Sequence, residues 1–214
     1  MPAAPVHVVL VPGLGLDERS SARVRERLPG TVVRLPGMGL PGPVPRLETL
    51  ADRLLAGMGE GPVMLAGHSQ SCQVVAVAAR DPRVIAVVLF GPTTDPRLRS
   101  ATGLIRRWLA TAWAEPWWQV PLVLAQWTRT GPGATAALWR VAAPDRIERR
   151  LRDVVAPVVV VRGTRDRLCP HDWAGRLAGA APRGRLVELP GAAHMTVQTH
   201  PDDVVAILRS AGAG

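Results

Sequence analysis

Tyrosine and asparagine are absent from the sequence, phenylalanine occurs once and cysteine only twice. Two cysteines, Cys72 and Cys169, cannot build the disulfide framework that stabilises small secreted domains. The residues after Met1 form neither a cluster of positive charges nor a long apolar segment, so no secretion signal is expected. We therefore expect a protein of the reducing cytoplasm.

Long hydrophobic runs are also missing, although 47% of the 214 residues are hydrophobic. The longest candidate, residues 74–90, is interrupted by Arg80, Asp81 and Arg83, whereas a membrane span needs about 18 consecutive apolar residues. The sequence therefore predicts a soluble chain with no membrane span. A chain of this length can bury one core, so we expect a single domain over residues 1–214.

Acidic residues are fewer than basic ones: 17 against 26, all of the latter arginine, which gives a formal net charge of +9. A clustered excess of this kind would indicate binding to nucleic acid. Here the arginine pairs 106–107 and 149–150 are interleaved with Trp or acids instead of forming a basic stripe. A composition dominated by Ala, Gly, Pro, Val and Arg is that of a GC-rich genome, so we expect no nucleic-acid partner.

Short aliphatic, β-branched runs bounded by Gly or Pro recur along the chain. They are typical of strands buried on both faces, as in a parallel sheet. Helical stretches alternate with them, so the sequence predicts an α/β fold: a mostly parallel six-stranded sheet with helices on both faces. The expected strands are residues 6–11, 31–35, 62–67, 84–90, 157–163 and 185–190, and the expected helices include 47–58, 70–80, 171–180 and 202–209.

Residues 93–153 break this alternation. They contain no strand candidate, several helical patches separated by prolines, and six of the seven tryptophans. An inserted helical cap over approximately these residues explains both the length and the aromatic content, because Trp side chains form large apolar pocket walls. The alternative is that each Trp only packs the insertion against the sheet.

A serine stands where a buried strand meets a helix, in "LAGHSQSCQ" at residues 65–73. At such a junction the hydroxyl of Ser69 can be held above the carboxyl edge of the sheet, beside the N-terminus of the next helix. Gly67 can tolerate a sharp elbow, and Ser71 is small enough to pack against the neighbouring strand. Ser69 is thus a candidate nucleophile, and the alternative is a plain helix N-cap.

A serine nucleophile needs a base and a group that orients the base. Asp166 follows the strand at 157–163, and His194 follows the strand at 185–190, so both are expected at the same sheet edge as Ser69. Asp95, after the strand at 84–90, is the alternative acid. The remaining His and Cys show no metal-ligand spacing, so no metal and no cofactor are expected.

The oxyanion of a tetrahedral intermediate needs two hydrogen-bond donors. We expect the backbone N–H of Gln70, directly after Ser69, and that of Leu14, in the turn "VPGLGLD" after the first strand. The Gly-x-Gly of this turn does not continue as a dinucleotide fingerprint, because Glu18 stands where the third glycine is required.

The sequence resembles members of the α/β-hydrolase fold superfamily, and among them the small, helical-capped serine hydrolases, which include bacterial esterases, lactonases and carbon-carbon bond hydrolases. The resemblance covers nearly the whole chain, with the family's segments in the family's order. It implies Ser69 as nucleophile, Asp166 as acid and His194 as base, with Leu14 and Gln70 as oxyanion donors. The segments include "VVLVPGLGLD", "LAGHSQSCQVVAVAARDP", "VVLFGPTTDPR", "APVVVVRGTRDRLCP" and "LVELPGAAHMTVQTHP".

Three features depart from the family pattern. Pro12 stands where many members have His, Ser71 replaces the usual glycine, and the strands that precede the first one in larger members are missing. The first two concern the geometry of the oxyanion hole. The third shortens the sheet.

These residues predict a serine hydrolase that cleaves an ester, lactone or thioester of a hydrophobic small molecule through an acyl-enzyme. One alternative is a non-hydrolytic binding or tailoring protein on the same fold, such as an isomerase, cyclase or lyase of a biosynthetic pathway. Another is a carbon-carbon bond hydrolase with the same triad. The fold alone does not separate these activities.

Overall fold

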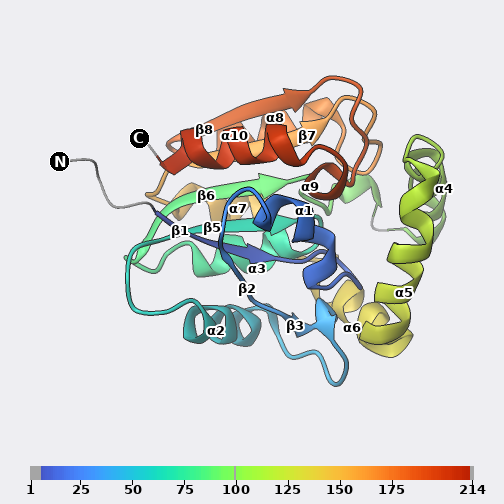
Figure 1. The fold of residues 1–214 in the computed structure, drawn as a ribbon, viewed down its shortest axis with the longest axis horizontal. Helices are drawn as coiled ribbons and strands as arrows, with labels where there is room; N and C mark the ends of the chain where they lie inside the picture. Colours follow the sequence, from blue (N-terminus) through green and yellow to red (C-terminus); the bar gives the residue numbers. More distant parts are fainter. Residues whose placement is uncertain (1–5, 99, 213–214) are drawn as a thin grey trace.

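A six-stranded parallel sheet forms the centre of the computed structural model, which describes residues 6–98 and 100–212 (Figure 1). The strand order is β2-β1-β5-β6-β7-β8, and each neighbouring pair is parallel. This confirms the predicted fold class. The strands are β1 (His7–Val11), β2 (Thr31–Val32), β5 (Val63–His68), β6 (Val84–Phe90), β7 (Val158–Gly163) and β8 (Gly184–Leu189).

The central strands are apolar on both faces because each face contributes to a separate core. In β5, Val63 and Leu65 join one cluster of buried side chains, whereas Met64 and Ala66 join the other. All six residues of β5 are buried. Continuous aliphatic runs are what a sheet covered by helices on both sides requires.

Helices cover both faces of the sheet. One face packs against α2 (Leu47–Gly57), α3 (Ser71–Ala78) and α8 (His171–Ala180). The opposite face packs against α1 (Ala22–Arg25), α9 (Thr196–Thr199) and α10 (Pro201–Gly212). A 3-10 turn, η1 (Glu18–Ser21), precedes α1. Among the described residues, none of the helices combines the length and apolar character needed to cross a bilayer.

The expected second strand, at residues 31–35, is divided in the structure. Thr31 and Val32 form β2, and the chain then leaves the sheet to form β3 (Leu35–Pro36), which pairs with β4 (Gly39–Leu40). A tight turn at Gly37, with a φ of 80°, permits this pairing. The carbonyl of Gly37 accepts the N–H of Gly15 at 2.8 Å, so the extra pair supports the turn after β1.

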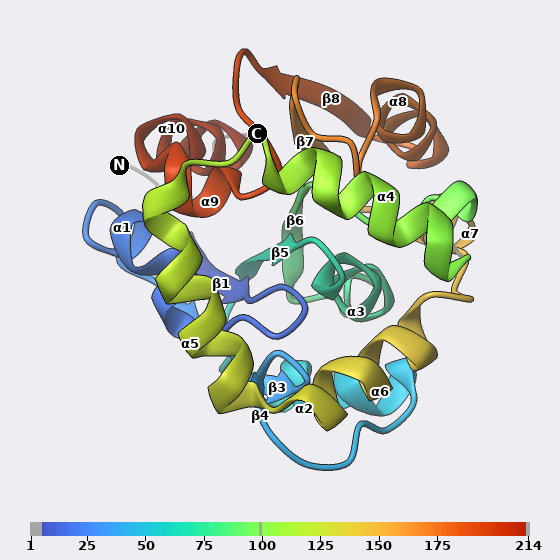
Figure 2. The same ribbon diagram turned by 90° about the vertical axis from the view of Figure 1, so that its right-hand side faces the viewer.

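Residues 93–153 lie between β6 and β7 and, where described, contain helices and no strand. Figure 2 looks onto this region and shows α4, α5 and α6 arranged around the carboxyl ends of the central strands. We call these residues the insertion. Its elements are η2 (Pro96–Leu98), α4 (Ala101–Ala112), η3 (Trp117–Gln119), α5 (Val120–Thr130), α6 (Pro132–Ala142), α7 (Ile147–Arg150) and η4 (Leu151–Asp153).

Candidate active site

Ser69 occupies a strained elbow between β5 and α3. Its φ is 56°, and it is the only non-glycine residue with a positive φ among residues 6–98 and 100–212. A serine rarely adopts this conformation unless its surroundings enforce it. Here its N–H donates to the carbonyl of Phe90 at 2.8 Å, and a Cβ on Gly67 would lie only 3.2 Å from Cα of Cys72. The sharp turn therefore depends on close packing of β5 against α3.

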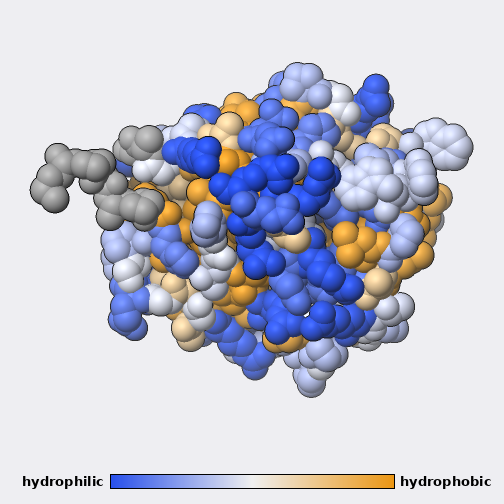
Figure 3. Space-filling view, in the orientation of Figure 1, coloured by the Kyte–Doolittle hydropathy of each residue, from blue (hydrophilic) through white to orange (hydrophobic). Residues whose placement is uncertain are grey.

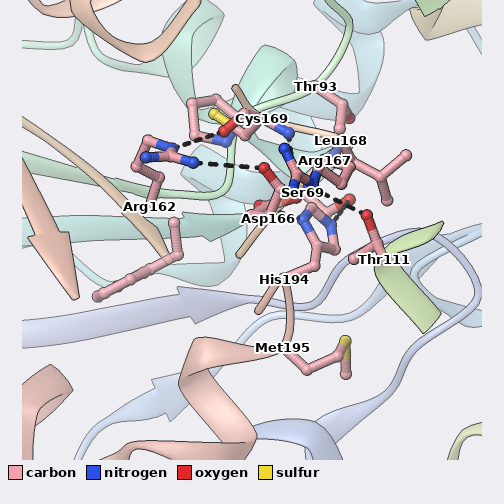
Figure 4. A network of polar contacts seen from close by, with 12 residues as sticks. Ser69, Thr93, Thr111, Arg162, Asp166, Arg167, Leu168, Cys169, His194 and Met195 are labelled. Carbon is pink, nitrogen blue, oxygen red and sulfur yellow. Dashed lines mark hydrogen bonds and ion pairs between the residues drawn. The ribbon is translucent and has the colours of Figure 1, made fainter. Parts of the chain in front are cut away.

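The structure brings Ser69, His194 and Asp166 together in one hydrogen-bonded line (Figure 4). Nε2 of His194 lies 2.9 Å from Oγ of Ser69, and Nδ1 of His194 lies 2.7 Å from Oδ2 of Asp166. His194 follows β8 and Asp166 follows β7. Because these strands are parallel, both residues lie at the same edge of the sheet as Ser69. A nucleophile, a base and an acid with this geometry can transfer a proton from the hydroxyl to the imidazole.

Backbone donors hold the carboxylate of Asp166 on the side away from His194. Its Oδ1 accepts the N–H groups of Leu168 at 2.8 Å and of Cys169 at 3.1 Å. Burial raises the pKa of Asp166, but the charge and hydrogen bond of His194, together with these N–H groups, outweigh burial and leave the pKa below its usual range. Asp166 is therefore an ionised, acceptor-only partner for His194.

A buried arginine in β7 supports the loop that carries Asp166. Arg162 donates to the carbonyl of Cys169 at 2.8 Å and to that of Asp166 at 3.3 Å, and it pairs with Glu188 (Figure 4). The loop after β7 thus closes around the guanidinium. The polar residue inside the aliphatic run "VVVVRG" was the only sequence feature that could have indicated this role.

The imidazole of His194 is buried beside a carboxylate. Burial lowers its pKa, but the charge of Asp166, the hydrogen bond to Asp166 and the charge of Glu115 outweigh burial, so the net pKa is raised above 6.5. The raised pKa makes His194 a stronger base. Its Nδ1 faces a carboxylate, so Nδ1 carries the proton and Nε2 faces Ser69 as the acceptor.

His68, directly before Ser69, packs beside the imidazole of His194. Its Nε2 lies 3.1 Å from the carbonyl oxygen of His194, and the two rings are 5.1 Å apart between centroids. Burial, followed by the charge of His194, lowers the pKa of His68 to about 3. His68 is therefore neutral, and it donates from Nε2 to the backbone of His194.

Asp95, the alternative acid, and His171 do not contact His194 through any of their described hydrogen bonds or ion pairs. Asp95 is engaged by Arg97, whose N–H donates to Oδ1 at 2.8 Å, and Asp166 is the carboxylate on His194. His171 lies 3.1 Å from Glu188. In the part of the chain that the structure describes, no three His, Cys, Asp or Glu side chains are grouped so as to hold a metal ion.

The two expected oxyanion donors, Leu14 and Gln70, line the same cavity as Ser69 and His194. Ser71, which replaces the family's glycine, connects the Ser69 elbow with the end of β1. Its Oγ lies 2.9 Å from the carbonyl of Val11 and accepts the N–H of His68 at 2.8 Å. The end of β1, which leads into the Leu14 turn, is thereby attached to the elbow.

A cavity of about 470 Å³ opens above Ser69. Its wall is mostly aliphatic and aromatic and comes largely from the insertion, so it suits an apolar group of drug-like size. The lining side chains of the insertion include Leu104, Ile105, Trp108, Val123, Leu124, Trp127 and Trp139.

The insertion also contacts the loops that carry His194 and Asp166. The N–H of Met195, next to His194, donates to Oε1 of Glu115 at 2.7 Å. Oγ1 of Thr111 in α4 accepts the N–H of Arg167, next to Asp166, at 3.1 Å (Figure 4). Sequence reasoning missed both contacts, because nothing in the local pattern around Glu115 or Thr111 indicates a distant partner.

Gly91 is a further residue that the sequence did not single out. It directly follows β6 and has a φ of 52°, and a Cβ at this position would lie 2.9 Å from Nδ1 of His194 and 3.2 Å from Oδ2 of Asp166. Only a residue without a side chain leaves room for the His194–Asp166 pair at this point.

The sequence model of the alpha/beta hydrolase family matches residues 8–207, and the chain belongs to this family. The predicted membership of the superfamily is thus confirmed. No curated protein matches the chain significantly.

Solved structures with the same fold are numerous and distant in sequence. A hydrolase from Oleispira antarctica is 15% identical with a TM-score of 0.77, and the match covers 96% of this chain and 90% of that chain. A thermophilic esterase from Thermogutta terrifontis is 21% identical with a TM-score of 0.73, covering 97% and 89%. A serine hydrolase involved in carbazole degradation is 18% identical with a TM-score of 0.70, covering 97% and 90%.

Proposed function

We propose that this chain is a serine hydrolase that cleaves an ester, lactone or thioester of an apolar small molecule through an acyl-enzyme. The observation that carries the proposal is the line of contacts from Ser69 through His194 to Asp166 at the base of a mainly apolar cavity. An esterase and a serine hydrolase among the structures of the same fold are consistent with this chemistry.

In the first half of the reaction, Nε2 of His194 takes the proton of Ser69 as Oγ attacks the carbonyl carbon. The backbone N–H groups of Leu14 and Gln70 hold the resulting oxyanion. The tetrahedral intermediate then collapses, and His194 returns the proton to the departing alcohol or thiol, which leaves the acyl group on Ser69.

In the second half, His194 removes a proton from water, and the hydroxide attacks the acyl-enzyme. The second intermediate expels Oγ of Ser69, which recovers its proton from His194, and the carboxylic acid is released. Asp166 remains ionised throughout, keeps Nδ1 of His194 protonated and stabilises the imidazolium that forms in each half.

The proposed substrate class follows from the side chains with which the insertion lines the cavity. We assign residues 93–153 as a cap of a single hydrolase domain, because their tryptophans and aliphatic side chains form most of the cavity wall over Ser69. An acyl or aromatic group of matching size would be desolvated there, which favours apolar substrates.

The test is labelling with a fluorophosphonate, followed by intact mass and peptide mapping, on the wild type, Ser69→Ala and Ser210→Ala. Ser210 is an exposed serine on α10 and serves as the matched control. We expect one adduct per chain on Ser69 in the wild type and in Ser210→Ala, and none in Ser69→Ala. Folded wild-type protein that takes up no label would contradict the proposal.

Turnover is then measured with p-nitrophenyl esters and thioesters of graded chain length. Loss of the nucleophile should lower turnover by about a thousandfold or more. Turnover by Ser69→Ala equal to that of the wild type would exclude the acyl-enzyme and favour a non-hydrolytic use of the cavity.

A further inference from the structure

The outer side of the insertion carries large apolar side chains that are exposed. Trp113 is 94% exposed and Trp117 is 83% exposed. Figure 3 shows hydrophobic residues on the right-hand rim of the molecule, where Figure 1 places α4 and α5. We call the following side chains the apolar face: Ile105, Trp108, Leu109, Trp113, Trp117, Trp118, Val120 and Leu124.

The apolar face is continuous with the mouth of the cavity. Ile105 and Trp108 in α4, and Val120 and Leu124 in α5, are exposed and also line the cavity above Ser69. The spacing of residues 105, 108 and 109 places these side chains along one side of α4, and Trp113 is the C-cap residue directly after this helix. An apolar surface of this kind on a protein marks an interaction site rather than ordinary exposure.

The residues of the insertion around the apolar face are mostly basic where they are charged. Between residues 96 and 143, Glu115 is the one acidic residue, and its two carboxylate oxygens accept from Met195 and Gln119 inside the molecule. The same stretch contains six arginines, at positions 97, 99, 106, 107, 129 and 140. Arg97 pairs with Asp95 and Asp172, and Arg129 pairs with Glu18. Arg106 is exposed on α4, next to Ile105 of the apolar face. Arginines scattered over the whole chain indicate no partner, but an exposed arginine on the helix that carries Ile105, Trp108 and Leu109 is complementary to an anionic surface.

We propose that the apolar face docks the protein on an anionic lipid surface, with Trp113 and Trp117 inserted at the level of the headgroups and Arg106 beside lipid phosphates. Trp combines an apolar ring with a polar N–H and is the preferred residue at this depth, and basic residues beside it add electrostatic attraction. The docked orientation turns the mouth of the cavity toward the lipid. An apolar chain then reaches the cavity without crossing water.

A second copy of this chain fits the apolar face less well. A two-fold interface brings a surface against itself, so arginines of one copy would face arginines of the other, with no free carboxylate on either side. Lipid phosphates supply the missing negative charge.

The test uses full-length Ser69→Ala, so that binding is measured without hydrolysis and is independent of the proposed function. The probes are sedimentation with vesicles of phosphatidylcholine and phosphatidylglycerol in equal amounts, vesicles of phosphatidylcholine alone, and quenching of Trp fluorescence by brominated lipid. The net charge of +9 gives some attraction to any anionic vesicle, so position-specific variants decide the outcome.

Trp113→Ser/Trp117→Ser should lower the partition to anionic vesicles by about tenfold or more and remove most of the quenching. Val155→Ser, at an apolar position that is 80% exposed outside the apolar face, is the matched control and should bind as the parent does. Arg106→Gln should lower binding by about fivefold. Arg53→Gln, at an exposed arginine on α2, should have little effect.

Two results would overturn the proposal. One is equal loss of binding in the apolar-face variants and their controls, or no binding of the folded parent at low salt, because the whole-chain charge would then explain any attraction. The other is a dimer, or a complex with an acidic protein, that Trp113→Ser/Trp117→Ser disrupts while vesicle binding is unaffected. Because the parent and every variant carry Ser69→Ala, neither result depends on the proposed hydrolysis.

Discussion

The hydroxyl of Ser71 lies 2.9 Å from the carbonyl oxygen of Val11 and joins the end of β1 to the elbow that carries Ser69. The same hydroxyl lies 2.9 Å from the carbonyl of His68 and accepts the N–H of His68 at 2.8 Å. A glycine at this position, as in most of the family, offers none of these contacts. The departure from the family pattern therefore adds a connection between the two segments expected to hold the oxyanion.

Ser71→Ala should destabilise the protein and slow the reaction. The substitution leaves the buried N–H of His68 and the carbonyl of Val11 without this partner, which costs about 1–3 kcal/mol in the free energy of unfolding. Release of Val11 also loosens the turn that carries Leu14, so kcat should fall more than KM rises. Denaturant unfolding and ester turnover check both effects, with Ser210→Ala as control. Stability equal to that of the wild type would show that the contacts contribute nothing.

Glu115→Gln should shift the pH profile of activity. The carboxylate of Glu115 helps to raise the pKa of His194, and only neutral His194 can accept the proton of Ser69. Removal of the charge lowers the pKa of His194, so the acid limb of kcat/KM moves to lower pH. The Gln side chain can still accept the N–H of Met195, and Gln119 can turn its amide to match, so the contact is retained.

The pH profile of Glu115→Gln is compared with that of Glu60→Gln, a matched change at an exposed glutamate. An acid limb that moves in both variants, or in neither, would show that Glu115 does not act on His194. A fall in activity without any change in the profile would indicate only a structural role.

Asp166→Asn should alter stability in a pH-dependent way. The pKa of Asp166 is lowered from 3.8 on folding, so its contribution to stability is complete above pH 3.8 and is lost as pH falls through the folded value. The pKa of His194 is raised from 6.5, so its contribution is complete below pH 6.5 and is lost as pH rises through the folded value. Wild type and variant should therefore differ most in unfolding free energy between these two pH values.

Denaturant unfolding of wild type and Asp166→Asn across this range checks the prediction. A difference that is independent of pH would contradict the ionised pair. Turnover of the variant should fall by roughly 10⁴-fold near neutral pH, because the amide no longer holds Nδ1 of His194 protonated.

The sheet and the candidate triad were accessible from the sequence for a simple reason. Parallel strands end at one edge, so residues directly after buried aliphatic runs meet there, whatever their separation in the chain. Ser69, Asp166 and His194 each follow such a run. The aliphatic runs therefore predicted both the strands and the candidate residues that directly follow them.

Contacts between distant segments were not accessible. Residues 31–35 form one β-branched run, but the turn at Gly37 and the pairing of β3 with β4 take Leu35 out of the sheet. Glu115 lies between α4 and η3 and reaches Met195 across 80 positions of sequence, and the residues around it do not indicate that partner. Tertiary packing determines where this strand breaks and which distant residues meet, and the local pattern of a single sequence does not contain that information.

Gly91→Ala should impair catalysis without touching any of the reacting groups. The new methyl group would lie 2.9 Å from Nδ1 of His194, and alanine is unfavourable at a φ of 52°. Displacement of the imidazole by a fraction of an ångström to one ångström costs on the order of 10²-fold in kcat. The rate of fluorophosphonate labelling and ester turnover should fall together, because both need His194 in line with Ser69. Gly175→Ala in α8, where a Cβ meets nothing within 4 Å, is the control and should keep both rates. Wild-type rates in Gly91→Ala would mean that the His194–Asp166 pair tolerates a side chain at this point and that its position is not set by β6.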